Sequence, residues 1–168
     1  MWETRPAFGS KEYKAMDHLT WRFAAILGAL IATSASMGAS LYEESVLDRV
    51  WPRKPNIVRP IEGGANRTLF WVPADLIAIT SLLVATWAAW PATDTRVAVL
   101  VGVGLYAINI GVSVGYFVPE LLKVERIGAR PDDPSSRTWV RRNRWRGAIF
   151  VCTTAALSLA VASLASVS

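Results

Sequence analysis

A polar stripe runs along an apolar segment near the middle of the chain. Its residues recur at intervals of three and four positions, the spacing that places side chains on one face of a helix: Tyr106, Asn109, Ser113, Tyr116 and Glu120. Polar side chains inside a membrane usually face protein or a water-filled cavity, and they often mark function. Two interpretations stay open for Asn109 and Ser113: part of a functional interior, or hydrogen bonding to a neighbouring helix.

Further residues able to bind ligands or transfer protons stand at the ends of other apolar segments. Trp139, Asn143 and Arg146 share a helical face by their spacing of four and three. Acids, an amide, a guanidinium and aromatic rings are expected to converge at one mouth of a bundle: Tyr42, Glu43, Glu44, Trp71, Asp75, Tyr116, Glu120, Trp139, Asn143 and Arg146. They predict a pocket for a flat, weakly acidic organic molecule. The alternative is that they are solvated helix ends, where charges commonly collect.

The elements that must position these residues are membrane spans. Hydrophobic residues make up 52% of the 168-residue chain, and four apolar runs are each about 20 residues long, enough to cross a bilayer. We expect spans at about 22–42, 72–90, 96–118 and 146–167, with Pro119 ending the third helix. The connections 43–71 and 119–145 are too short to bury a core of their own. The sequence therefore predicts an all-α, integral membrane four-helix bundle, with residues 1–168 as a single four-span domain.

The distribution of basic residues predicts orientation. Thirteen of the 18 Lys and Arg residues lie in or beside the two long connections, and five lie on the other side. The positive-inside rule then places both connections in the cytoplasm and both termini outside. The first apolar run is too long for a removable signal peptide, so we expect a multi-pass protein of the inner (plasma) membrane. The net charge of +5 is interpreted as a topology signal, and no nucleic-acid partner is expected.

Metal and cofactor chemistry fits the sequence poorly. His18 is the only histidine, and we expect it at the end of the bundle away from the proposed pocket. Carboxylate-bridged metal sites in helical bundles normally use Glu-x-x-His spacing, and haem needs a suitable axial ligand. The sequence contains no Glu-x-x-His motif and no convincing pair of axial haem ligands. It also contains no phosphate-binding loop and no nucleophile elbow. No metal, haem or other cofactor is therefore predicted.

Short motifs from all four spans resemble the anthrone-oxygenase-like family of small four-helix membrane proteins. They are Gly38-Ala39-Ser40-Leu41-Tyr42-Glu43, Phe70-Trp71-Val72-Pro73, Tyr116-Phe117-Val118-Pro119 and Trp139-x-x-x-Asn143-x-x-Arg146. By this resemblance the chain is similar to cofactor-free oxygenases of polyketide pathways, which turn an anthrone into an anthraquinone. The resemblance implies that a phenolic substrate is oxidised by molecular oxygen.

The residues allow a mechanism for such a reaction. A ridge of small residues along the first span leads to Glu44, which we expect to act as general base and to pair with Arg146. Asn143 and Arg146 would stabilise the resulting enolate. The rings of Trp71, Tyr116 and Trp139 would stack on the substrate. Tyr42, Glu43, Asp75, Asn109 and Glu120 complete the predicted binding site.

A non-catalytic role remains the alternative. Gly111 and Gly115 form a Gly-x-x-x-Gly pair, which allows a second helix to approach closely. In this interpretation the chain is an accessory or structural subunit of a larger membrane complex, or a homo-oligomer, and its basic loops contact anionic lipid. An enzyme should purify alone and bind a small aromatic molecule, whereas a subunit should purify with its partners.

Overall fold

The computed structural model describes the backbone of residues 10–127 and 134–166. Within these residues, four helices are long and apolar enough to cross a membrane. They are formed by α1 (Ser10–Tyr42), α3 (Arg67–Ala89), α4 (Thr93–Val112) and α6 (Pro134–Ala165). The predicted all-α four-helix bundle is confirmed, and the chain is a multi-pass membrane protein.

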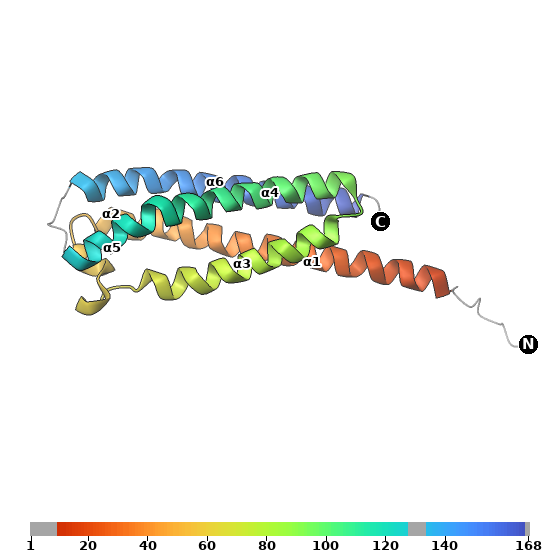
Figure 1. Cartoon of the computed structure of the whole chain (residues 1–168), viewed down its shortest axis with the longest axis horizontal. Coiled ribbons are helices and arrows are strands. Elements are labelled where there is room, and N and C mark those ends of the chain that lie inside the picture. Colours follow the sequence, from red (N-terminus) through yellow and green to blue (C-terminus); the bar gives the residue numbers. More distant parts are fainter. Residues whose placement is uncertain (1–9, 128–133, 167–168) are drawn as a thin grey trace, which may run out of the picture.

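Helix α2 (Asp48–Val50), the connection from α2 to α3, helix α5 (Val118–Ile127) and the first residues of α6 gather at one end of the bundle, called here the end with the long connections (Figure 1). The first residues of α1, the last residues of α6 and the short turn between α3 and α4 lie at the other end. Helix α1 packs against α3 and α6, and α4 packs against α6, whereas α3 and α4 pack less closely. A space is therefore left between α3 and the chain that continues α4.

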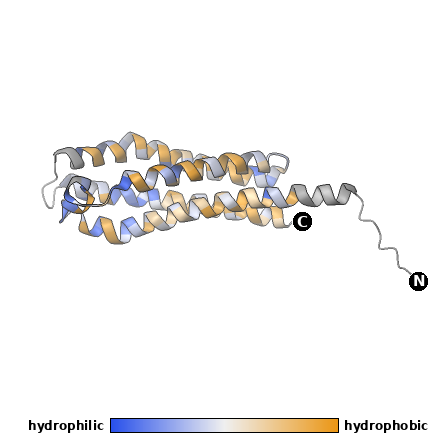
Figure 2. Ribbon diagram, turned by 90° about the horizontal axis from the view of Figure 1, so that it is seen from below, coloured by the Kyte–Doolittle hydropathy of each residue, from blue (hydrophilic) through white to orange (hydrophobic). Residues whose placement is uncertain are grey.

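The bundle interior is closely packed by small residues and a few large ones. Ala29, Ala85 and Ala160 are fully buried beside Phe150 and Leu157. Such small residues let helix backbones approach each other in a membrane. The outward surfaces carry large apolar side chains, and hydrophilic residues concentrate toward the end with the long connections (Figure 2). This distribution suits helices surrounded by lipid.

Two wide helical turns interrupt the long helices at the same end of the bundle. Residues Glu43–Leu47 form a π-helical turn that leads from α1 into α2 (Asp48–Val50), and Ser113–Phe117 form another that leads from α4 into α5 (Val118–Ile127). The third span therefore continues past Pro119, and the expectation that it ends there is wrong. Proline removes one intrahelical hydrogen bond, and a wide turn just before it accommodates that loss.

The connection between α2 and α3 covers this end of the bundle. It contains the short 3₁₀ turns Pro55–Val58 and Pro60–Glu62. The side chain of Asn66 accepts a hydrogen bond of 3.2 Å from the backbone N–H of Leu69 and so caps α3. This cap fixes the position of the next residue, Arg67, whose side chain turns into the bundle.

Candidate functional site

A cluster of charged and amide side chains is buried at the end of the bundle that carries the long connections. All its members expose less than a tenth of their surface: Glu43, Asp48, Arg67, Asn109, Asn143 and Arg146. They come from α4, α6, α3 and the two segments that follow α1. Ionised groups are costly to place at membrane depth unless they pair with one another, so the cluster is a candidate functional site.

Arg67 pairs with two carboxylates. Its Nη2 lies 3.4 Å from Asp48 Oδ1, and its Nε lies 3.5 Å from Glu43 Oε1. The Nε contact is an ion pair without hydrogen-bond geometry. The guanidinium also lies 5.1 Å from the ring centroid of Trp139 and 5.9 Å from that of Trp51, within the range of cation–π attraction. Arg67 therefore joins the segments after α1 to the start of α3.

Arg146 is held by amides instead of carboxylates. Its Nη1 donates to Asn143 Oδ1 at 3.1 Å, and its Nε donates to Asn109 Oδ1 at 3.4 Å. Asn143 Nδ2 in turn donates to Asp48 Oδ2 at 2.9 Å. The guanidinium lies over the ring of Phe117, 5.2 Å from its centroid. Among the described residues no carboxylate forms an ion pair with Arg146, so its charge is available to a ligand.

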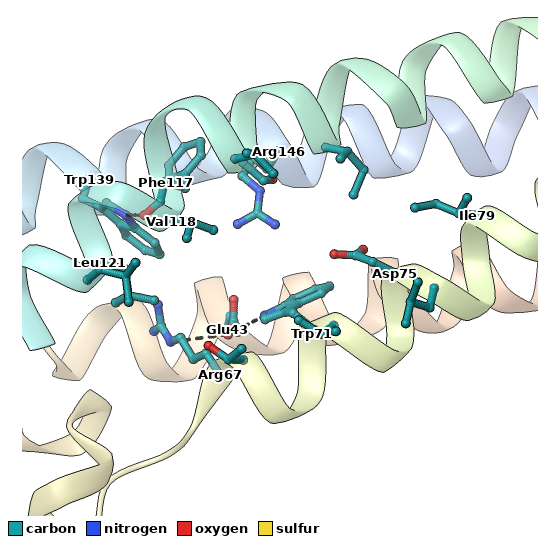
Figure 3. Close-up of a pocket in the computed structure, with 17 residues that line it drawn as sticks. Glu43, Arg67, Trp71, Asp75, Ile79, Phe117, Val118, Leu121, Trp139 and Arg146 are labelled. Carbon is teal, nitrogen blue, oxygen red and sulfur yellow. Dashed lines mark hydrogen bonds and ion pairs between the residues drawn. The ribbon is translucent and has the colours of Figure 1, made fainter.

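Asp75 projects from α3 toward Arg146 (Figure 3). Its Oδ1 accepts a hydrogen bond of 2.7 Å from the hydroxyl of Tyr106. Within the described part of the chain, Oδ2 makes no hydrogen bond or ion pair. Trp71, one turn earlier on α3, donates from Nε1 to Glu43 Oε1 at 3.1 Å and stacks on Phe150. Asp75 is therefore a carboxylate with one fixed oxygen and one free oxygen.

A cleft of about 330 Å³ gives access to these groups. Apolar side chains on α3 face apolar side chains on the α4–α5 segment across it, and the polar groups lie deeper (Figure 3). Several wall residues are also exposed on the outer surface of the bundle: Val72, Leu76, Ile79, Val114, Val118 and Leu122. The cleft therefore opens sideways, toward the lipid, between two neighbouring helices that pack less closely than the other neighbouring pairs.

The structure gathers part of the predicted site around this cleft. Five of the predicted residues line it: Glu43, Trp71, Asp75, Trp139 and Arg146. Asn109 and Asn143 lie behind Arg146 and hold its guanidinium. These seven side chains therefore belong to one connected region, contributed by α3, α4, α6 and the π-helical turn that follows α1.

Three other predicted residues lie outside the cleft. Tyr42 is exposed on the outer surface, and Glu120 pairs with Lys123 at 2.5 Å on the surface of α5. The ring of Tyr116 packs against the guanidinium of Arg142, 4.9 Å from its carbon to the ring centroid. The π-helical turn Ser113–Phe117 explains the last two positions, because it breaks the regular spacing of the polar stripe.

Glu44 also differs from its predicted position. It accepts a long hydrogen bond, 3.5 Å, from Ser40 Oγ, and its carboxylate lies against Gly147, where a Cβ atom would overlap it. The described residues contain no direct Glu44–Arg146 ion pair, and the two charges interact only at longer range. Glu44 continues the ridge of small residues on α1, as its bond to Ser40 four positions earlier indicates, but it lies against α6, so Glu43 and not Glu44 lines the cleft.

Two members of the cluster were not singled out in the sequence. Arg67 is one of the thirteen basic residues that indicate topology, and the sequence assigns no role to Asp48. One signal could have found Arg67: a cation in the first turn of a helix opposes the helix dipole, so it needs a compensating acid nearby. Asp48 follows Glu43 by five residues, which is the spacing of neighbours in a π-helical turn. A spacing of five residues does not indicate neighbouring side chains on a regular α-helix, so it could not identify Asp48 before the wide turn was known.

Metal ligation finds no support in the side chains that the structure describes. Within them, no group of three or more His, Cys, Asp or Glu side chains is placed to hold a metal ion. The side chain of His18 lies outside the described residues, so its predicted position away from the site stays a prediction.

Comparisons of the chain with protein-family models, with curated proteins and with solved structures found no match.

Proposed function

We propose that the protein binds a planar phenolic or anthrone-like molecule in the cleft and oxidises it with molecular oxygen, without a cofactor. One observation carries the proposal. The free oxygen of Asp75 and the guanidinium of Arg146, which has no carboxylate partner among the described residues, face the same cleft. A base beside a fixed positive charge is the arrangement needed to form and stabilise an enolate.

The walls of the cleft suit a flat, lipid-soluble substrate. Trp71, Phe117 and Trp139 supply aromatic surface, and the outer walls are aliphatic. A molecule dissolved in the bilayer would reach the polar groups through the sideways opening between α3 and α4–α5. Its phenolic or ketone oxygen would then bind at Arg146, while the hydrocarbon rings remain against the apolar walls.

The chemistry can be written from these groups. Asp75 accepts a proton from the CH₂ group conjugated with the ketone, and Arg146 stabilises the negative charge that develops on oxygen. The enolate passes one electron to O₂, and the resulting radical and superoxide combine to a peroxide. Proton return and loss of water leave a new carbonyl. The substrate loses two hydrogens and gains one oxygen atom, the other oxygen leaves as water, and no external reductant is consumed.

Asp75 takes the place of Glu44 as the proposed base. Glu44 does not line the cleft, whereas Asp75 does. Tyr106 acts as a positioning residue, because its hydroxyl fixes one oxygen of Asp75 and leaves the other for the substrate. Asn109 and Asn143 position the guanidinium of Arg146 in the same way.

Turnover of an anthrone by the purified protein in lipid nanodiscs tests this proposal. We expect one O₂ consumed per anthraquinone formed, and a loss of about 100-fold or more in Asp75→Asn, since general bases contribute about 10² to 10⁴ in rate. Asp94→Asn is the matched control, because Asp94 is exposed in the first turn of α4 at the opposite end. Oxygen consumption that is equal with and without protein would refute the oxygenase proposal, and full activity of Asp75→Asn would refute the assignment of the base.

A second candidate function is a non-catalytic subunit of a membrane complex. Gly111 and Gly115 are exposed, and a Cβ atom at either position would meet nothing within 4 Å. The end of α4 and the π-helical turn that follows it are therefore open to a helix from another chain. Gly111→Leu should abolish co-purification of a partner if this candidate is right, and it should leave a self-sufficient enzyme active.

The orientation in the membrane also belongs to the proposal. We propose that the long connections lie in the cytoplasm and the termini outside the plasma membrane, as the distribution of Lys and Arg indicates. The cleft then opens in the half of the bilayer nearer the cytoplasm, because it lies at the end of the bundle with the long connections.

A further inference from the structure

A second cavity, of about 440 Å³, lies between the first turns of α6 and the segment formed by α2 and the turn after it. Asp48, Pro52 and Val140 form part of its wall. The rest of the wall consists of arginines: Arg49, Arg53, Arg137, Arg141 and Arg144. None of these five arginines lines the cleft between α3 and α4–α5.

The arginines are arranged on two facing surfaces. Arg137, Arg141 and Arg144 follow each other on α6 at intervals of four and three residues, so they share one face. Arg49 and Arg53 face them from the segment after α1. Guanidinium groups gathered around one cavity repel each other unless an anion lies between them.

The wall of this cavity contains five arginines and a single acid, Asp48. Asp48 is the acid in its wall, but its two oxygens are already engaged by Arg67 and Asn143 on the interior side. Among the described residues, Arg49, Arg53, Arg141 and Arg144 form no ion pair with any acid. The cavity therefore presents an excess of positive charge in a concave site, which is what an anion requires.

The level of the cavity in the membrane indicates the kind of anion. Trp145, adjacent to Arg144, exposes 74% of its surface. Exposed tryptophans in membrane proteins are enriched at the level of the lipid headgroups. The planar guanidinium group matches phosphate oxygens with two parallel hydrogen bonds. An anion at this level with phosphate oxygens is the headgroup of a phospholipid.

We propose that this arginine-lined cavity binds the headgroup of an anionic phospholipid. The phosphodiester lies between the guanidinium groups of α6 and those of Arg49 and Arg53, and the acyl chains remain in the bilayer. Anionic lipids are enriched in the cytoplasmic leaflet, which is the leaflet that the basic connections indicate for this end of the bundle. The proposal is independent of the oxidation proposed for the cleft, because the cavity and the cleft share no lining residue.

Titration of the full-length protein in a non-ionic detergent with dioctanoyl-phosphatidylglycerol tests the proposal. We expect binding at least ten-fold tighter than that of dioctanoyl-phosphatidylcholine. A basic residue near anionic lipid contributes about five-fold in affinity, so Arg141→Gln with Arg144→Gln should weaken binding about 25-fold. The matched control is Arg142→Gln with Lys123→Gln, which removes the same charge from α6 and α5 outside the cavity and should change affinity less than about three-fold.

Three results would overturn the proposal. Equal losses in the two double variants would mean diffuse attraction to a basic surface. Equal affinity for the two lipids would mean that the headgroup charge is not recognised. Competition by inorganic phosphate as effective as phosphatidylglycerol itself would mean a site for free phosphate instead of lipid.

A second pair of substitutions covers the case in which the glutamine variants do not fold. Arg141→Lys with Arg144→Lys keeps the charge but removes the bidentate geometry. A loss of at least three-fold in phosphatidylglycerol affinity would support the cavity, and unchanged affinity would overturn it.

Discussion

Replacing Arg67 should destabilise the protein more than any replacement of a surface arginine. The side chains of Arg67, Glu43 and Asp48 expose only 5%, 10% and 1% of their surface. Arg67→Met would leave Glu43 and Asp48 without their cation at membrane depth. Removing one partner of a buried ion pair costs about 3 to 5 kcal/mol. For a chain of this length that corresponds to a loss of roughly 6 to 20 °C in melting temperature.

The matched control is a surface ion pair in the same connection. Arg59 pairs with Glu62, and their side chains expose 24% and 40% of their surface. Exposed pairs contribute about 0 to 1 kcal/mol, so Arg59→Gln should lower the melting temperature by at most a few degrees. Thermal unfolding of both variants in the same detergent, followed by circular dichroism, makes the comparison.

A combined variant isolates the cause of the loss. Glu43→Gln and Asp48→Asn added to Arg67→Met remove the uncompensated charges, so the triple variant should recover much of the lost stability. Melting of Arg67→Met within a few degrees of Arg59→Gln would refute the reasoning. A triple variant no more stable than Arg67→Met would show that packing of the arginine matters and pairing does not.

Two further predictions concern packing and orientation. Gly102→Ala should destabilise the protein by about 1 to 3 kcal/mol in thermal unfolding, because the new Cβ would lie 3.2 Å from Leu157 Cγ. Gly104→Ala is the control and should not destabilise the protein, since a Cβ there meets nothing within 4 Å. Equal effects of the two variants would contradict the packing of α4 on α6. Arg59→Cys in a Cys152→Ser background should react with a membrane-impermeant thiol reagent only after the cells are opened, and labelling in intact cells would reverse the proposed orientation.

Regular helical spacing made part of this structure predictable. The uninterrupted helix α6 contains Trp139, Asn143 and Arg146. Their spacing of four and three residues therefore places all three side chains on one buried face, as predicted. The four apolar runs could be read as helices with equal clarity, because a segment that crosses the hydrocarbon core must satisfy its own backbone hydrogen bonds.

Spacing misled where the helices change their winding. Tyr116 is displaced from the predicted face by the wide turn Ser113–Phe117. Glu44 keeps its place on the small-residue ridge, but it lies against α6 and not at the cleft. A wide turn depends on tertiary packing and leaves no periodic pattern in the sequence. The pairing of Arg67 with Asp48 was hidden for another reason: it joins residues across an irregular connection, whose path no local pattern determines.

A planar phenolic ligand is proposed to occupy the cleft between α3 and α4–α5. A bulky substitution at the mouth of the cleft tests this occupancy most directly. Leu76 and Leu83 are both on α3 and expose similar fractions of their surface, 60% and 63%, but only Leu76 lines the cleft. We predict that Leu76→Trp weakens binding of an anthraquinone to the protein in nanodiscs at least ten-fold, about 1.4 kcal/mol, while Leu83→Trp leaves the dissociation constant unchanged. Equal dissociation constants for the two variants would place the ligand elsewhere and contradict the account.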